Sequence, residues 1–154
     1  MSRLFPTLMI LAGAALAGAT VGVAPGFAPR QPAAAATDAE PLADCRVVDG
    51  DTLRCDRERI RLLGIDAPEV AGHCRPGRNC VPGDPVASTD SLAAALTPPL
   101  TIERVGTDRY GRTLGLVAGR GGDLSCWQLD HGQAVYVSRW DNDGRLAAIC
   151  PAAR

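Results

Sequence analysis

The chain has 154 residues, 46% of them hydrophobic, a length that suits one domain with a modest core. Its 16 basic residues are all arginine and stand against 17 acidic residues. Residues 37–154 hold 14 of the arginines and all 17 acids, a formal charge of −3. This balance argues against a nucleic-acid-binding protein that works through bulk positive charge, so any phosphate chemistry must come from a local site.

Residues 1–36 are predicted to be an export signal peptide. Arg3 opens the segment, an apolar stretch covers 4–23, and alanines at 33–36 supply the small residues that signal peptidase requires. An uncleaved membrane anchor is the alternative, but the uninterrupted apolar run, 8–23, is shorter than the roughly 20 residues that span a bilayer. We therefore expect a secreted or periplasmic protein with no membrane attachment after cleavage.

The rest of the chain divides into an acidic linker, 37–43, and a folded domain, 44–154. Five short strands and two short helices indicate an α+β, mainly β fold and suit an OB-type Greek-key barrel, although this spacing also allows another small α+β fold. The elements expected from turn signals, caps and apolar spacing are a hairpin over 46–55, a strand over 59–65, a loop over 67–85, a helix over 86–96, strands over 100–105 and 113–118, a helix over 124–131, and irregular or short-strand structure over 133–154.

Six cysteines follow the predicted signal peptide, and an even number in a small exported domain favours disulfides. A zinc site is the alternative, but the sequence has no CxxC pair and only two histidines. The pairs expected from position are Cys45–Cys55 across the hairpin, Cys74–Cys80 around a short loop and, by elimination, Cys126–Cys150 at the C-terminal tail.

Three short stretches carry the candidate chemistry, namely 49–52 (DGDT), 61–69 (RLLGIDAPE) and 108–112 (DRYGR). Taken singly, each has an ordinary structural interpretation as a turn, a solvated strand or a hairpin loop. Taken together, they supply the carboxylates and guanidiniums from which a phosphate-handling site can be built.

Two aspartates in these stretches, Asp51 and Asp66, offer hard oxygen ligands for Ca²⁺ or a similar cation. Two ligands are too few for a closed cage, so such a site would stay open for water and a substrate phosphate. Arg61 and Arg112 can hold phosphate oxygens, and Glu69 can activate or orient water. These groups are the ones that attack on a phosphodiester requires.

The strand that carries Arg61 and Asp66 must bend for this site to form. The two residues are five apart, so in a flat strand their side chains point to opposite faces. Gly64 permits a bulge and Pro68 takes the chain out of regular pairing. The hypothesis therefore predicts an irregularity at 63–66.

In this order, the three stretches resemble the motifs of the thermonuclease family, the staphylococcal-nuclease-like nucleases. The similarity runs from about Cys45 to Trp140. It implies an OB-type barrel and a calcium-dependent phosphodiesterase that acts on DNA and RNA. A monomer without a stable protein partner is the default expectation for the chain. The roles that the resemblance implies are Asp51, Asp66 and the Ala67 backbone carbonyl as calcium ligands, Arg61 and Arg112 as catalytic residues on the scissile phosphate, Glu69 as general base, and Tyr110 as a lining of the nucleotide site.

The chain also departs from the family pattern. Ser138 and Trp140 stand where the best-known member has aromatic residues that help to bind the nucleotide. The expected short disulfide loop is an addition near the site, and its Arg75 and Arg78 either approach the substrate or are simply solvated.

A non-catalytic alternative is an OB-fold envelope protein that binds nucleic acid or another ligand. Such a module would use stacking platforms and a basic groove. The negative charge of residues 37–154 and an aromatic content of 4% argue against it.

Overall fold

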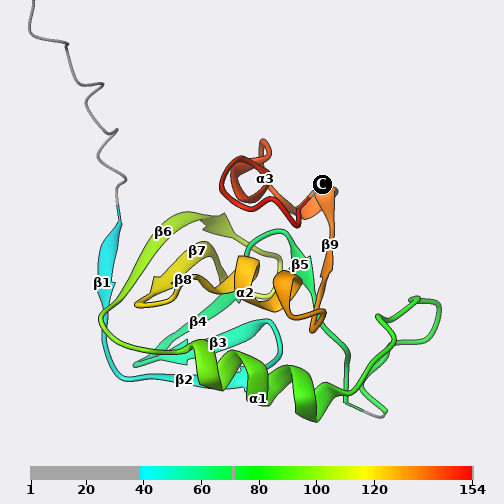
Figure 1. The fold of residues 1–154 in the computed structure, drawn as a ribbon. Helices are drawn as coiled ribbons and strands as arrows, with labels where there is room; N and C mark the ends of the chain where they lie inside the picture. The colour runs from blue at the N-terminus through cyan, green and yellow to red at the C-terminus, as the bar shows by residue number, and fades with distance from the viewer. Residues whose placement is uncertain (1–38, 71, 154) are drawn as a thin grey trace, which may run out of the picture. The chain divides into compact units, whose positions relative to one another are not determined.

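The computed structural model describes residues 39–70 and 72–153, which belong to the compact unit spanning 34–154. The predicted signal peptide, 1–36, lies outside the described residues. Within them the fold is mainly β, with a curled seven-stranded sheet, a two-stranded sheet and three α-helices (Figure 1). The elements are β1 (Glu40–Leu42), β2 (Cys45–Asp49), β3 (Thr52–Cys55), β4 (Glu58–Leu62), β5 (Ile65–Asp66), α1 (Pro85–Ala95), β6 (Leu100–Thr107), β7 (Thr113–Gly119), β8 (Gly122–Asp123), α2 (Leu124–Asp130), β9 (Val135–Tyr136), a 3₁₀ helix η1 (Ser138–Trp140) and α3 (Arg145–Ile149).

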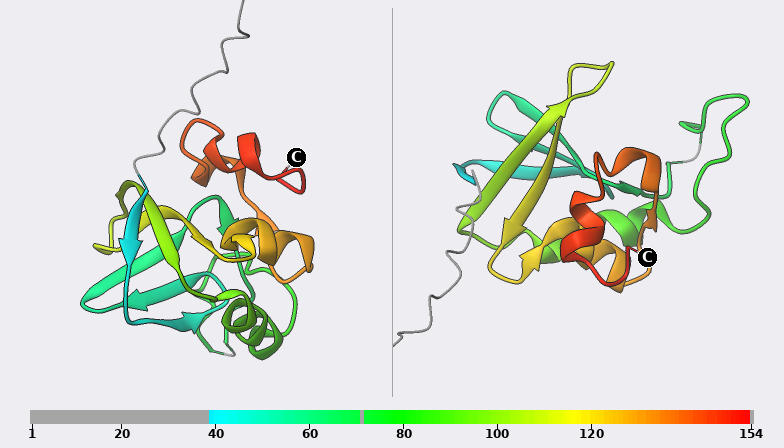
Figure 2. Two further views of the ribbon diagram at one scale, coloured as in Figure 1. Left: turned by 60° about the vertical axis from the view of Figure 1, so that its left-hand side comes forward. Right: turned by 90° about the horizontal axis from the view of Figure 1, so that it is seen from above.

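The large sheet runs in the order β1-β6-β7-β4-β3-β2, with β8 added to β7. Its two edge strands, β1 and β2, follow one another directly in the chain. They are joined through Ala43 and Asp44, which has a φ of 48°. One bent segment thus pairs with β6 at one edge and with β3 at the other, and the sheet curls accordingly, as Figure 2 shows from two directions.

The observed fold agrees with the α+β, mainly β prediction, and the five expected strands correspond to β2, β3, β4, β6 and β7. The expected linker over 37–43 is wrong in its described part, because Glu40–Leu42 form a strand paired with β6. This strand forms because the edge of β6 is free to pair with the chain before the chain enters the hairpin. No helix in the described part of the chain is long and apolar enough to cross a bilayer.

The hairpin β2–β3 is the first half of the site scaffold. Its register sets Cys45 opposite Cys55, and a disulfide joins the two, as the spacing predicts. A shift of register between Val47 and Asp49 shortens the connection, so that Asp49 pairs with Thr52. The turn therefore consists of Gly50 and Asp51, whereas the cysteine spacing in the sequence also allows a three-residue loop over 49–51.

The predicted irregularity at 63–66 is confirmed. Strand β4 ends at Leu62, Gly64 takes a φ of 72°, and β5 leaves the large sheet to pair with β9. The amide of Gly64 donates to the carbonyl oxygen of Trp140 (3.2 Å), and Val137 donates back to Gly64 (2.8 Å). Because the chain reverses here, residues on either side of Gly64 can face one another.

Helix α1 lies against β2 of the hairpin, and α2 lies against α1 and β7 (Figure 1). Each begins at an aspartate cap: Asp84 accepts hydrogen bonds from the first turn of α1, and Asp123 accepts one from the amide of Cys126. The core between helices and sheet is aliphatic. Its fully buried side chains include Leu53, Ile60, Leu62, Leu63, Ile65, Leu92, Ile102, Val117, Leu124 and Leu146.

The C-terminal segment contains a helix, α3, that the sequence pattern did not predict. Asp141 is fully buried and accepts hydrogen bonds from the Leu146 amide (2.6 Å), the Ala147 amide (3.0 Å) and the Tyr136 hydroxyl (2.7 Å). This one carboxylate ties the start of α3 to the strand β9 before it.

The third expected disulfide is not formed, and Cys126 and Cys150 are free thiols. Burial, and then a hydrogen bond with Cys150, raise the pKa of Cys126. The tail is held instead by α3, whose Leu146 side chain is completely buried. A noncovalent anchor therefore takes the place that we assigned to the bridge.

Candidate active site

The guanidinium of Arg61 lies between Asp51 and Asp66. One terminal nitrogen forms a short ion pair with Asp51, and the other donates to Asp66 (3.1 Å) and to the carbonyl oxygen of Ile65 (3.0 Å). All three side chains are buried, with 9% of Arg61, 3% of Asp51 and 5% of Asp66 exposed. Two motifs that are separate in the sequence thus meet at one buried guanidinium.

Several hydrogen bonds hold Asp51 in place at the hairpin turn. Its Oδ2 accepts from the backbone amide of Ala67 (2.9 Å), and its Oδ1 accepts from the Thr52 hydroxyl (3.1 Å). The side-chain amide of Gln128 on α2 donates to the carbonyl oxygen of Gly50 (2.7 Å). Helix α2 therefore fixes the hairpin turn through Gln128, and the carboxylate of Asp51 has a defined position.

The third motif approaches from the β6–β7 loop. Asp108 accepts from the backbone amide (2.9 Å) and side chain (2.8 Å) of Arg112, whose other end reaches the Thr52 hydroxyl (3.5 Å). Desolvation acts to raise the pKa of Asp108, but these hydrogen bonds outweigh it and lower the pKa. Burial, followed by the positive charge of Arg112, lowers the pKa of Arg61. The two arginines thus repel one another, and a bound anion would relieve that repulsion.

Glu69 lies on the same side of the site, but it is paired with an arginine that the motifs do not include. Arg78 donates through one terminal nitrogen to both oxygens of Asp66 (2.7 Å each) and through the other to Glu69 (2.8 Å). The hydrogen bond with Asp66 raises the pKa of Arg78. Of the two expectations for Arg78, solvated loop residue or site residue, the structure supports the second.

These groups line a cleft of about 1290 Å³. Seven arginines and three acidic residues line the cleft. The cleft therefore has an excess of positive charge, although residues 37–154 as a whole carry a formal charge of −3. Arg61, Arg78 and Arg112 are paired with the acids, whereas no acidic partner within the described ranges pairs with the other four: Arg59, Arg75, Arg109 and Arg139. The cleft is therefore suited to an anion with several charges.

Two aromatic side chains stand among these arginines. Tyr110 is half exposed, and its hydroxyl accepts from Arg75 (2.5 Å), whose guanidinium lies 4.9 Å from the ring centre. The ring of Trp140 lies 5.6 Å from the guanidinium of Arg61. Trp140 thus lines the cleft, whereas Ser138 does not line it.

Two of these carboxylates are of the kind that a hard divalent cation binds. The carboxylates of Asp51 and Asp66 converge on a single guanidinium, and both offer the oxygen ligands that Ca²⁺ prefers. No group of three or more His, Cys, Asp or Glu side chains suited to a metal occurs among the residues that the structure describes. The carbonyl oxygen of Ala67 is the third expected ligand, and the amide of the same residue donates to Asp51.

Sequence reasoning missed the part played by Gln128 and underrated that of Arg78. Gln128 is fully buried and also donates to the carbonyl oxygen of Ser88 (2.9 Å) on α1, so it fastens two helices to the hairpin turn. The signal for it in the sequence is a glutamine one helical turn after Leu124, on the face of α2 that also buries Ser125. For Arg78 the signal is an arginine inside a short cysteine-closed loop after the second motif.

Comparison with known proteins gives two partial similarities, and no protein-family model matches the chain. The chain is 34% identical over 120 residues to the succinoglycan biosynthesis protein ExoI of Rhizobium meliloti (strain 1021). The match covers 75% of this chain and 62% of that protein. It is 36% identical over 78 residues to the thermonuclease of Staphylococcus intermedius, covering 47% of this chain and 45% of that protein. The chain thus spans only part of the length of these curated relatives, and its likeness to a thermonuclease is distant and partial.

Proposed function

We propose that the chain is a secreted or periplasmic calcium-dependent nuclease that hydrolyses the phosphodiester bonds of DNA and RNA. The distant similarity to a thermonuclease suggests a nuclease-like function. The finer assignment rests on the residues of the cleft.

One observation carries the proposal. Arg61 and Arg112, which are 51 residues apart in the sequence, both line the cleft and both contact the buried Asp51–Thr52 dipeptide, Arg61 through Asp51 and Arg112 through the Thr52 hydroxyl. Two neighbouring guanidiniums repel one another, an anion between them offsets that repulsion, and phosphate is one of the two anions that guanidiniums hold in two-pronged fashion. A purely structural role would not require Arg112 to stand so near a buried arginine.

In the mechanism that we propose, Arg61 and Arg112 hold the scissile phosphate and offset the negative charge that builds on its non-bridging oxygens. Glu69 accepts a proton from the attacking water, and Arg112 donates to the departing oxygen. Tyr110 lines the site for the adjoining nucleotide.

A calcium ion would be held by Asp51, Asp66 and the backbone carbonyl of Ala67, and when bound it supplies positive charge beside the phosphate. Two disulfides are typical of a protein in an oxidising compartment, which supports export. In this proposal the protein acts as a monomer, and nucleic acid, its substrate, is its partner.

The test is hydrolysis of single-stranded DNA and of RNA by the oxidised protein, in Ca²⁺, in Mg²⁺ and in a chelator. We expect calcium-dependent cutting that falls by a factor of about 100 to 10,000 in both Arg61→Ala and Glu69→Gln, since each removes a group that acts on the transition state.

Two matched controls change the same residue types outside the cleft. Arg120→Ala removes an exposed arginine that bonds only the carbonyl oxygen of Pro98, and Glu103→Gln removes a carboxylate paired with Arg145. Both are expected to cut normally. If the wild-type protein cuts neither nucleic acid in any metal yet binds single strands, the non-catalytic binding protein replaces the nuclease.

A further inference from the structure

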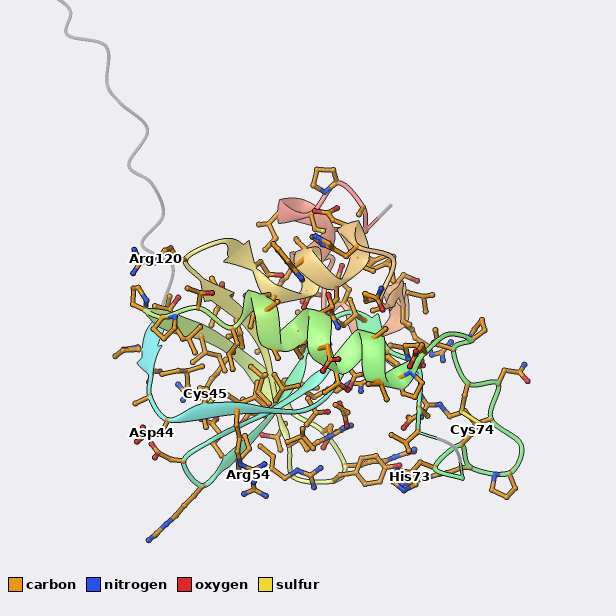
Figure 3. All side chains as sticks on the ribbon, turned by 60° about the horizontal axis from the view of Figure 1, so that its bottom comes forward. Asp44, Cys45, Arg54, His73, Cys74 and Arg120 are labelled. Carbon is orange, nitrogen blue, oxygen red and sulfur yellow. A yellow bond between two sulfur atoms is a disulfide. The ribbon has the colours of Figure 1, made fainter. Side chains whose placement is uncertain are left out.

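The loop closed by Cys74 and Cys80 carries an arginine into the candidate site. The disulfide spans six positions, and the loop projects from the body of the fold, where Figure 3 labels Cys74. None of its described residues is buried, so the loop contributes nothing to the core. Arg78 nevertheless reaches back from it to Asp66 and Glu69, which belong to the strand end and the segment after it.

Arg78 uses the same carboxylate oxygens that a cation would need. Both oxygens of Asp66 accept from one of its nitrogens at 2.7 Å, and Glu69 accepts from the other at 2.8 Å. Asp66 is 5% exposed and also accepts from Arg61. Since a carboxylate oxygen cannot direct the same lone pairs to a guanidinium and to a metal ion, the two must compete.

We propose that Arg78 is an affinity-determining residue that competes with the divalent cation for Asp66 and is held in place by its second contact, with Glu69. This inference rests on the proposed function, because it assumes that Asp66 is a cation ligand. With Arg78 in place, the carboxylate pair is already neutralised. A cation must displace the two-pronged ion pair before it binds, so the apparent Kd of the cation is raised by the stability of that pair.

The disulfide strengthens this competition. Closure of a short loop removes much of the freedom that the loop backbone would otherwise have, and so lowers the entropy cost of holding Arg78 against the carboxylates. Without the disulfide, Arg78 would stay near the site but would pair with Asp66 and Glu69 for a smaller fraction of the time.

The test is calorimetric titration of the full, oxidised protein with Ca²⁺ at constant ionic strength, without nucleic acid. We expect Arg78→Gln to lower the calcium Kd by about tenfold, the change typical of the loss of one charge-assisted pair that is partly exposed. Arg78→Lys keeps a charge without the two-pronged geometry and should fall between wild type and Arg78→Gln. Arg75→Gln removes an equal charge from the same loop, where it bonds Tyr110 and no carboxylate, and should leave the Kd within about twofold of wild type.

The double substitution Cys74→Ser, Cys80→Ser provides a second measurement that leaves Arg78 intact, and it should lower the Kd by a smaller factor than Arg78→Gln. An unchanged or raised Kd in Arg78→Gln and in the double variant would overturn the inference while calcium binding itself, and the proposed function, stand. If neither wild type nor Arg78→Gln binds Ca²⁺, both the inference and the calcium dependence fail. An equal effect of Arg75→Gln would show that only general charge matters, and would also overturn the inference.

Discussion

Gly50 is required by a close approach between the hairpin turn and α1 rather than by the turn conformation. A Cβ at this position would overlap the Ser88 hydroxyl and lie 2.8 Å from the Cβ of Ala67. The carbonyl oxygen of Gly50 also accepts from Gln128, which fixes its distance from the helices. The residue therefore sets how closely the helix layer approaches Asp51.

We expect Gly50→Ala to lower the free energy of unfolding by about 2 to 3 kcal/mol, as overpacking of a close contact does. Gly106→Ala is the control, because its Cβ would meet nothing within 4 Å, and it should cost less than about 1 kcal/mol. Urea unfolding followed by circular dichroism measures both. Equal losses in the two variants would show that the Gly50 contact is not what matters.

At the scale of the element, the start of α2 depends on a cap that titrates. Desolvation raises the pKa of Asp123 to about 6, although the amide of Cys126 donates to its side chain (2.9 Å) and opposes the shift. An unfolded aspartate titrates near 3.9. The folded state therefore binds the proton on Asp123 more tightly than the unfolded chain does. Protonation of Asp123 thus stabilises the fold fully below about pH 4, and this contribution is lost as the pH rises through about 6.

We expect Asp123→Asn, which keeps an acceptor at the cap, to become more stable relative to wild type by up to about 3 kcal/mol between pH 4 and pH 7. The free energies of unfolding of both proteins at these two pH values test this. Asp84→Asn, at the exposed cap of α1, serves as the control. A difference between wild type and Asp123→Asn that stays constant with pH would contradict the expectation.

At the scale of the whole molecule, the two disulfides contribute differently to stability. Cys45–Cys55 joins two paired strands of the sheet, and Cys55 belongs to the core with 3% exposure. Cys74–Cys80 closes a loop with no buried residue in its described part. The first thus constrains residues that order on folding, whereas the second constrains a segment that packs on little in the folded state.

Replacement of Cys45 and Cys55 by serine is expected to lower the free energy of unfolding by about 2 to 3 kcal/mol, the amount that closure of a loop of this size removes from the unfolded chain. Replacement of Cys74 and Cys80 should cost less than about 1 kcal/mol, because the freed loop gains similar freedom in both states. Urea unfolding without reductant measures both variants. A larger loss from the second pair would show that its loop supports the fold.

Local chemistry in the sequence was sufficient for much of the scaffold. The hairpin turn near Gly50, the pairing of Cys45 with Cys55, the cap at Asp123 and the break at 63–66 are decided by residues close together in the chain. Turn propensity, capping and strand alternation act over a few residues, which is why they can be predicted without a structure. The candidate site residues Asp51, Asp66 and Arg61 were likewise identified by their motifs, and their convergence followed from the predicted break.

Only the tertiary structure decided the contacts between distant segments. It showed that Arg78 pairs with Asp66 and Glu69, that Gln128 holds the hairpin turn, and that Asp141 anchors α3 so that the tail needs no disulfide. Each of these depends on which polar group lies within hydrogen-bonding distance once the core has packed. A buried carboxylate or amide must find a partner, and the identity of that partner is set by the approach of elements far apart in the sequence.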